Sequence, residues 1–259
     1  LYKTQKAICA LPFIHKQTEE VVHRNMRIGV GVTGICQSLN KIDWLDECYN
    51  SLREYDKKWS AKKGYPESIR LTTVKPSGTL SLLSGSTPGV HPAYAEYFIR
   101  RVRMSSDDAL VDICRSANYT VEYARQFDGT EDRGTVVIEF PCHINGNAIL
   151  AKDMSAVKQL ELVKKLQTKW SDNSVSVTVY YRLEELDEIK EWMKEHYENS
   201  LKTVSFLLHN EHGFDQAPYE EITKEEYQKM ASKLKPMVGV ESGDVLNELE
   251  CAGGSCPIR

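Results

Sequence analysis

Apolar residues recur along the chain with two periods, one typical of helices and one typical of strands. Residues 43–63 predict the clearest helix, because apolar side chains recur there at spacings of three and four and Gly64 follows. The same period predicts helices in four further stretches: 18–39, 155–170, 183–197 and 223–235. Short runs rich in β-branched residues predict strands at 69–74, 135–140, 174–181 and 203–208. Because strands and helices alternate, the pattern predicts an α/β fold made of parallel β/α units.

Residues 69–83 have the order in which phosphate sites are built: a strand, a turn of small polar residues, and an apolar run that opens a helix. The first backbone N–H groups of a helix have no partner inside it and attract anions. Hydroxyl groups in the turn could add donors, and a glycine there lets a ligand approach the backbone. The alternative is an ordinary strand-to-helix turn with a Ser or Thr cap. The candidate phosphate-binding residues are Ser77, Gly78, Thr79, Leu80 and Ser81.

Residues 29–34 read Gly-Val-Gly-Val-Thr-Gly, a formal match to the GxGxxG fingerprint of dinucleotide sites. That fingerprint also requires a strand directly before it and an acidic residue about 20 residues further on, at the end of a second strand. The preceding residues 22–27 suit a polar helix, and residues 43–63 are expected to be helical too. We therefore interpret the small residues as permitting close backbone packing rather than as a nicotinamide site.

Two features follow the turn. His91 lies between Val90 and Pro92, a setting more typical of a loop residue than of a metal ligand or a base. Residues 94–104 combine aromatic side chains with three arginines, which favours a helix with a solvated basic face. The alternative is a wall that contacts an anionic or planar ligand.

The composition is that of a globular protein, since 41% of the 259 residues are hydrophobic and 27% are charged. The net charge is −4 and no basic block occurs, which argues against nucleic acid as a partner. No apolar run reaches about 18 residues, so the sequence predicts no membrane-spanning helix. The chain opens at Leu1 in what reads as a helix already under way, and we expect a fragment of a longer protein.

The seven cysteines fall into two groups. Five lie in apolar or helical contexts and are expected to be buried free thiols of a reducing, cytoplasmic compartment: Cys9, Cys36, Cys48, Cys114 and Cys142. Cys251 and Cys256 are separated by four small residues on a polar, acidic tail, which favours an exposed dithiol that exchanges with a disulfide elsewhere. The alternatives are a metal site or coincidence, and two thiolates alone cannot complete a zinc site. We expect no metal ion.

Four segments of the chain resemble adenosylcobalamin-dependent (class II) ribonucleotide reductases, in particular the ribonucleoside-triphosphate reductases. In chain order they are RIGVGVTGI (27–35), KPSGTLS (75–81), WSDNSVSVT (170–178) and CAGGSCPIR (251–259). The resemblance extends over essentially the whole chain and corresponds to the C-terminal portion of the family. It divides the chain into part of the reductase barrel, residues 1–236, and a flexible redox tail, residues 237–259.

The resemblance implies a ten-stranded α/β barrel of which this chain holds the C-terminal part. The implied reaction replaces the ribose 2′-hydroxyl of a ribonucleoside triphosphate by hydrogen, initiated by adenosylcobalamin through a thiyl radical. Residues 77–81 would bind the substrate phosphates, and cobalamin contacts would fall roughly within Gly85 to Gly146 and Ser205 to Asp244. Cys251 and Cys256 would re-reduce an active-site disulfide, with thioredoxin as the final reductant.

The chain also departs from the family. It contains no Asn-Pro-Cys-Gly-Glu motif, which carries the radical cysteine, and it lacks both cysteines of the active-site disulfide. We therefore expect the polypeptide to be inactive alone and to need the N-terminal part of the same protein. The alternative is a stand-alone phosphate-binding α/β module with a dithiol tail. A glutaredoxin-like enzyme fits less well, because its CxxC motif lies near a first strand.

Overall fold

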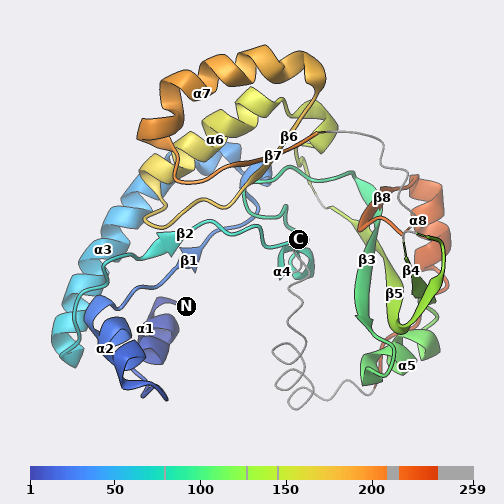
Figure 1. The fold of residues 1–259 in the computed structure, drawn as a ribbon, viewed down its shortest axis with the longest axis horizontal. Coiled ribbons are helices and arrows are strands. Elements are labelled where there is room, and N and C mark those ends of the chain that lie inside the picture. The colour runs from blue at the N-terminus through green and yellow to red at the C-terminus, as the bar shows by residue number, and fades with distance from the viewer. Residues whose placement is uncertain (79, 127, 145, 209–215, 239–259) are drawn as a thin grey trace. The chain divides into compact units, whose positions relative to one another are not determined.

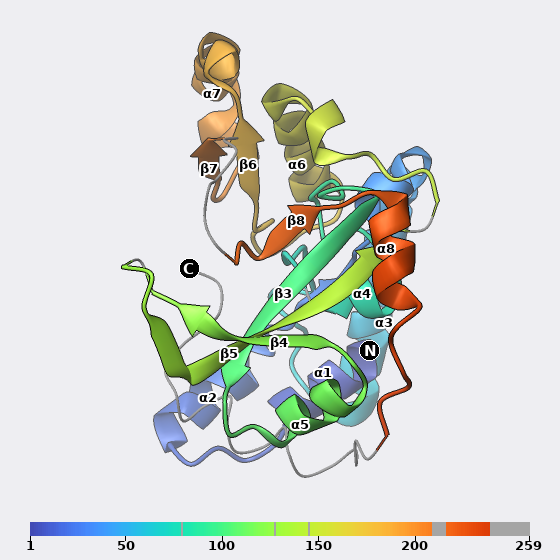
Figure 2. The same cartoon turned by 90° about the vertical axis from the view of Figure 1, so that its right-hand side faces the viewer.

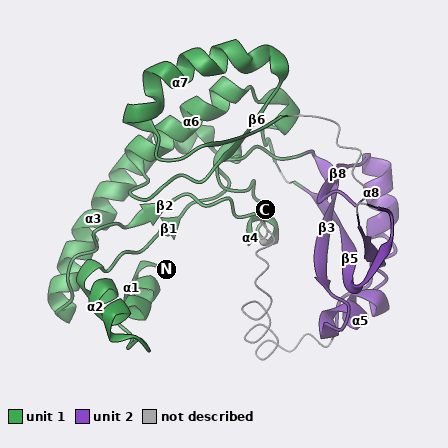
Figure 3. Ribbon diagram, in the orientation of Figure 1, with its two compact units in different colours: residues 1–94, 144–210 green, residues 95–143, 211–259 purple. Residues whose placement is uncertain are grey.

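The computed structural model describes residues 1–78, 80–126, 128–144, 146–208 and 216–238. The chain divides into two compact units, each made of two stretches of sequence (Figure 3). Unit 1 contains residues 1–94 and 144–210, and unit 2 contains residues 95–143 and 211–259. None of the described helices is both long enough and apolar enough to cross a lipid bilayer.

Unit 1 is organised around short parallel strands (Figure 1). The strands are β1 (Val30–Gly31), β2 (Thr72–Thr73), β6 (Thr178–Tyr181) and β7 (Ser205–Leu208). β1 pairs with β2 and β6 pairs with β7, and a parallel bridge between Val74 and Val175 links the two pairs. The order is therefore β1, β2, β6, β7, and within the described residues these strands form an open set rather than a closed barrel.

Helices cover one side of these strands, where Figure 1 shows α3, α6 and α7. The core of unit 1 is apolar: Leu160 and Val163 of α6 and Trp192 of α7 pack with Val177 and Val179 of the β6 segment. Parallel strands are normally covered in this way, which explains their run of valines. The helices of unit 1 are α1 (Tyr2–Cys9), α2 (Lys16–Asn25), α3 (Trp44–Lys63), α4 (Leu80–Leu83), α6 (Ala156–Lys169) and α7 (Leu186–Ser200), with short 3₁₀ turns at Ile35–Gln37, Leu39–Lys41, Ala151–Asp153 and Leu183–Glu185.

Unit 2 is a four-stranded antiparallel sheet in the order β4–β5–β3–β8 (Figure 2). Val111 and Cys114 of helix α5 (Ala109–Ser116) pack on Val136 and Ile138 of strand β5 (Glu131–His143). These four side chains form the core of unit 2. The elements are β3 (Tyr97–Ser105), α5 (Ala109–Ser116), β4 (Thr120–Arg125), β5 (Glu131–His143), β8 (Tyr219–Glu221) and α8 (Lys224–Ala231).

Several local predictions are confirmed. The helix expected over 43–63 is α3, and it ends at Gly64 with φ +70°. Ser155 caps α6 by accepting a hydrogen bond from the Lys158 N–H, and Thr223 opens α8 with a capping box. These features depend on neighbouring residues only, which is why the sequence shows them.

Four predictions about secondary structure and strand direction are wrong. The helix expected over 18–39 stops at Asn25, because Met26 adopts a left-handed conformation and the chain then enters β1. Residues 97–105 form a strand instead of part of a basic helix, and the expected parallel β/α units do not extend to unit 2, whose strands pair antiparallel. The strand expected to end at residue 140 continues through Pro141 to His143 as β5. Pro141 lies past Glu139, the last β5 residue paired with β4, so it needs no backbone N–H for a hydrogen bond on that side.

The prediction of buried thiols is correct only in part. All five described cysteines are free. Cys36 and Cys114 are buried, Cys9 and Cys142 are half-buried, and Cys48 is exposed on α3. Burial raises the pKa of the Cys36 thiol to about 12, so this group is an inert core residue.

Candidate functional site

The predicted phosphate-binding residues lie in a loop at the carboxyl end of β2. The chain leaves β2, turns at Ser77 with φ +53° and enters the short helix α4. This confirms the expected order of strand, turn and helix. Ser77 and Gly78 are half-buried, and the Leu80 side chain is 60% exposed. Thr79 lies outside the described residues. Open α/β sheets bind ligands beyond the carboxyl ends of their strands, so the loop has the right position for a site.

Ser81 is the buried member of the set. Its hydroxyl donates to the Ser77 carbonyl at 2.5 Å, and its backbone N–H donates to the same oxygen at 3.2 Å. Its own carbonyl accepts from the N–H groups of Ser84 and Ser86. In this conformation Ser81 therefore shapes the turn, while Ser77 and Gly78 lie nearer the surface.

The loop is closed at its base by Gly89. This residue has φ +54°, and a Cβ atom built on it would lie 2.2 Å from the Lys75 carbonyl oxygen. Only a residue without a side chain allows the two limbs of the loop to approach so closely. Residues 75–89 thus form a compact loop whose ends touch.

His91 lies just beyond this neck and is fixed on both sides of its ring. Its Nε2 accepts from the Thr178 N–H at 3.1 Å, so its Nδ1 must carry the proton, which it donates to the Pro88 carbonyl at 3.1 Å. Burial lowers the pKa of this imidazole. His91 is therefore a neutral structural residue that ties the loop to the start of β6, in line with the expectation that it is neither a metal ligand nor a base.

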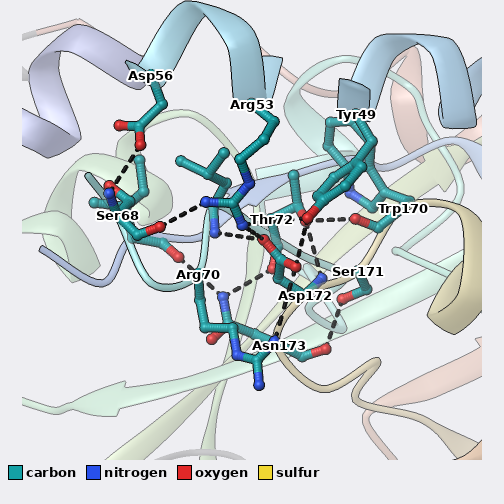
Figure 4. Close-up of polar contacts among 12 residues, drawn as sticks. Tyr49, Arg53, Asp56, Ser68, Arg70, Thr72, Trp170, Ser171, Asp172 and Asn173 are labelled. Atoms are coloured by element: carbon teal, nitrogen blue, oxygen red, sulfur yellow. Dashed lines mark hydrogen bonds and ion pairs between the residues drawn. The ribbon is translucent and has the colours of Figure 1, made fainter. Parts of the chain in front are cut away.

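The amino-terminal ends of the same strands carry a dense polar network that the sequence analysis did not single out (Figure 4). Asp172 accepts hydrogen bonds from the Tyr49 hydroxyl at 2.8 Å, Arg53 at 2.8 Å and the Leu71 N–H at 2.9 Å. Its carboxylate is 10% exposed. These contacts join α3 to the segments before β2 and β6, so Asp172 has a structural role.

The neighbouring residues of the WSDNSVSVT segment complete this network. The Thr72 hydroxyl donates to the Trp170 carbonyl and accepts from the Asp172 N–H. The Asn173 side-chain amide donates to the carbonyls of Ile28 at 2.9 Å and Thr72 at 2.8 Å. Polar side chains here satisfy backbone groups at the strand ends, which is a framework function.

A second buried charge pair adjoins this network. Lys6 of α1 is fully buried and bonds to Asp56 of α3 at 2.7 Å, to Ser68 at 2.8 Å and to the Pro66 carbonyl at 2.8 Å. Burial alone would raise the pKa of the Asp56 carboxyl, but the hydrogen bonds from Lys6, the Tyr2 hydroxyl and the Ser68 N–H outweigh it and lower that pKa. The pair fixes α1 to α3.

The two stretches expected to contact cobalamin meet in unit 2. β3 and β5 belong to Gly85–Gly146, β8 belongs to Ser205–Asp244, and β3 pairs with β8. The sheet also explains the arginines of residues 94–104. Arg101 bridges Glu139 and Glu220 across the strands, and the Arg100 guanidinium lies 4.5 Å from the centre of the Tyr219 ring.

Two further predictions concern metals and the tail. Among the described residues, no group of three or more His, Cys, Asp or Glu side chains is arranged to hold a metal ion. Cys251 and Cys256 lie outside the described residues.

The GxGxxG match does not make a dinucleotide site, because β1 lies inside it instead of ahead of it. A Cβ on Gly29 would lie 3.0 Å from the Thr73 methyl group, which confirms close packing.

Comparisons with known proteins point to one family. The family described as "Ribonucleotide reductase, barrel domain" matches residues 50–207. The adenosylcobalamin-dependent ribonucleoside-triphosphate reductase of Euglena gracilis is 35% identical over 250 residues, which cover 94% of this chain and 34% of the relative. The protein of that name from Lactobacillus leichmannii is 28% identical over 298 residues, covering 98% of this chain and 40% of the relative.

A solved structure supports the same relationship. The crystal structure of a B-12 dependent (class II) ribonucleotide reductase matches with a TM-score of 0.74 and 28% identity, covering 93% of this chain and 36% of the other. The chain spans roughly a third of the length of the Euglena relative.

Proposed function

This chain belongs to the ribonucleotide reductase barrel-domain family, and from that premise we propose that it is the C-terminal portion of an adenosylcobalamin-dependent ribonucleoside-triphosphate reductase. The whole protein would convert ribonucleoside triphosphates to 2′-deoxyribonucleoside triphosphates in the cytoplasm. The observation that carries the proposal is the loop of residues 77–81, which lies at the carboxyl end of a parallel strand in a chain that resembles these reductases over 94% of its length. Family membership favours this reading over an independent phosphate-binding module.

The described strands supply part of a larger barrel in this proposal. β7 exposes Phe206 and Leu207, although parallel strands are normally covered on both faces. The N-terminal part of the same protein would complete the ten-stranded barrel beside these strands. It would also provide the radical cysteine and the active-site disulfide that this chain lacks.

The loop would hold the substrate by its phosphates. Ser77 and Gly78 are half-buried and are the polar members of the predicted set that lie nearer the surface than Ser81, and backbone N–H groups with a serine hydroxyl are suitable donors for phosphate oxygens. α4 is a single turn, so its dipole adds little. The contribution of the loop would be position: it would fix the triphosphate so that the ribose lies over the barrel.

Unit 2 would hold the cofactor. The expected contact stretches lie on adjacent strands, where the half-buried Arg100 of β3 and Tyr219 of β8 stack on each other; they would present a guanidinium and an aromatic ring to a flat, amide-bearing macrocycle. When bound, adenosylcobalamin supplies the homolytic chemistry that starts the thiyl radical. Residues 237–259 would act as the redox tail, in which Cys251 and Cys256 reduce the active-site disulfide and are themselves reduced by thioredoxin.

The test begins with the gene upstream of Leu1, where we expect an in-frame extension that encodes Asn-Pro-Cys-Gly-Glu. The extended protein, given adenosylcobalamin and reduced thioredoxin, should form deoxynucleotides, whereas the 259-residue chain alone should not. Cys251→Ser should abolish turnover with thioredoxin and retain turnover with a small dithiol that can reach the interior directly. Deoxynucleotide formation by the 259-residue chain alone, or full thioredoxin-dependent turnover by Cys251→Ser, would overturn the proposal.

A further inference from the structure

Residues 33–37, which the proposed function leaves without a role, hold one limb of the phosphate loop. We call residues 84–91 the return limb, because they lead back from α4 to the neck of the loop. The Thr33 hydroxyl donates to the Thr87 carbonyl at 2.9 Å and accepts from the Gly89 N–H at 3.0 Å. The Gly34 N–H donates to the same carbonyl at 2.9 Å. One hydroxyl therefore binds the limb on both sides of Pro88.

Gln37 holds the limb one step nearer to α4. Its side-chain N–H donates to the Gly85 carbonyl at 3.1 Å, and its side-chain carbonyl accepts from the Thr87 N–H at 2.9 Å. A primary amide can satisfy a donor and an acceptor of the same backbone in this way, as a neighbouring strand would. Thr33 and Gln37 together bind four backbone groups of the return limb.

The return limb is in turn attached to the predicted phosphate-binding residues. The Ser86 N–H donates to the Ser81 carbonyl at 2.9 Å, and Ser81 is bonded to Ser77 through its hydroxyl and its N–H. At the neck, Gly89 touches the Lys75 carbonyl directly before the turn. A shift of the return limb would therefore be passed to Ser81 and Ser77.

Building on the proposed function, we propose that Gln37 and Thr33 are positioning residues for phosphate binding. They hold the return limb by its backbone and so keep Ser77 and Gly78 in the conformation that receives the triphosphate. The glycines of the GxGxxG match then serve this arrangement: they bring residues 33–37 close enough to the loop for side chains to bind its backbone. The motif acts on the nucleotide indirectly, through the loop.

Unit 1 contains a matched control. Gln167 of α6 binds backbone in the same manner, donating to the Ser171 and Asn173 carbonyls at 2.6 and 2.9 Å and accepting from the Val175 N–H at 3.1 Å. It lies at the amino-terminal ends of the strands. Gln167→Ala therefore removes a comparable set of hydrogen bonds without touching the loop.

The experiment measures tripolyphosphate binding to the 259-residue chain by calorimetry, together with hydrogen exchange of peptides that cover residues 75–89. Gln37→Ala and Thr33→Val should each weaken tripolyphosphate binding roughly tenfold and speed exchange in these peptides, because the bound conformation becomes a smaller fraction of the population. Thr33→Ser keeps the hydroxyl and should restore both values. Gln167→Ala should lower the melting temperature about as much as Gln37→Ala does. It should leave tripolyphosphate affinity and the exchange rate of residues 75–89 unchanged.

The possible outcomes separate the two levels of the proposal. If Gln37→Ala matches Gln167→Ala in affinity and in exchange, the positioning role is overturned. If the unchanged chain binds no tripolyphosphate, the phosphate assignment of residues 77–81 is overturned, and with it the positioning role. Failure of Thr33→Ser to restore binding would overturn the role of the Thr33 hydroxyl.

Discussion

The two ends of the parallel strands in unit 1 are built in opposite ways. At the amino-terminal ends, Asp172 is 10% exposed and bonds to side chains and backbone from several segments. At the carboxyl ends, residues 75–89 form a loop that is held along its return limb, and Leu80 at its tip is 60% exposed. Strands only a few residues long therefore separate a closed framework from an accessible loop.

The difference shows how one set of strands serves two demands. A buried polar network stabilises a fold only when every member is satisfied, so it cannot also offer free groups to a ligand. A loop held on one side keeps its other side available, at the cost of stability. α/β barrels divide the same two roles between the same two ends of their strands.

The largest effect on this comparison is expected from Lys6→Met. It leaves the Asp56 carboxylate buried without its cation, and loss of one partner of a buried pair costs about 3–5 kcal/mol. Urea unfolding at pH 7 measures this loss. Tripolyphosphate affinity of the folded variant should stay unchanged, because the pair lies at the framework end. A loss below about 1 kcal/mol would contradict a buried, charged pair.

The same variant should reverse a pH dependence. In the unchanged chain the pKa of Asp56 is lowered, so its stabilisation is present above the unfolded value of about 3.9 and is lost as the pH falls through the folded value. Without Lys6, burial dominates and raises this pKa, so the variant should become more stable as the pH falls from 7 towards 4. The double variant Lys6→Met with Asp56→Asn should lose that dependence.

A smaller effect is expected from Gly89→Ala at the loop end. The new Cβ would lie 2.2 Å from the Lys75 carbonyl oxygen, so the neck must open and tripolyphosphate binding should fall more than stability does. Gly64→Ala is the control, since Gly64 also has positive φ but has no atom within 4 Å of a built Cβ. Gly64→Ala should cost about 1–2 kcal/mol from backbone strain alone and leave binding intact. Equal binding by the two variants would contradict the contact at the neck.

The smallest effect is expected from His91→Gln, and it appears only on acidification. Burial lowers the pKa of His91, so the unchanged chain loses stability as the pH falls below the unfolded value of about 6.5 towards the folded value. The slope from one group is at most about 1.4 kcal/mol per pH unit. The difference in unfolding free energy between the unchanged chain and His91→Gln should therefore shrink between pH 7 and pH 5.5. A constant difference would mean that His91 is not held neutral.

Local features of this fold could be predicted from the sequence, and contacts between distant segments could not. The spacing of apolar residues placed α3 and α6, and the residues at Ser155 and Thr223 placed two caps. β1 was missed because two residues carry no periodicity, and its pairing with β2 decides the structure there. β3 was missed because Arg101 meets Glu139 and Glu220 across strands, a pairing that a helical reading of charge does not contain.

The candidate site also has a part that the sequence located and a part that it did not. The loop of residues 77–81 could be located because its order of strand, turn and helix is continuous in sequence. The roles of Gln37 and Asp172 could not, because their partners lie about 50 and 120 residues away. The small residues at 29–34 did indicate close packing, which the structure confirms at Gly29, where a built Cβ would lie 3.0 Å from the Thr73 methyl group.

Unit 2 is made of two stretches of the chain that are separated in sequence by part of unit 1. The ribosome therefore synthesises its first stretch well before its second. Arg100 of β3 bonds to the Pro218 carbonyl beside β8, 118 positions later in the sequence. A ribosome must therefore finish all of unit 1 before β8 exists, and until then β3 presents an unpaired strand edge to the cell. An unpaired strand edge favours aggregation, so ribosome stalling just before residue 216 should increase capture of the nascent protein by chaperones.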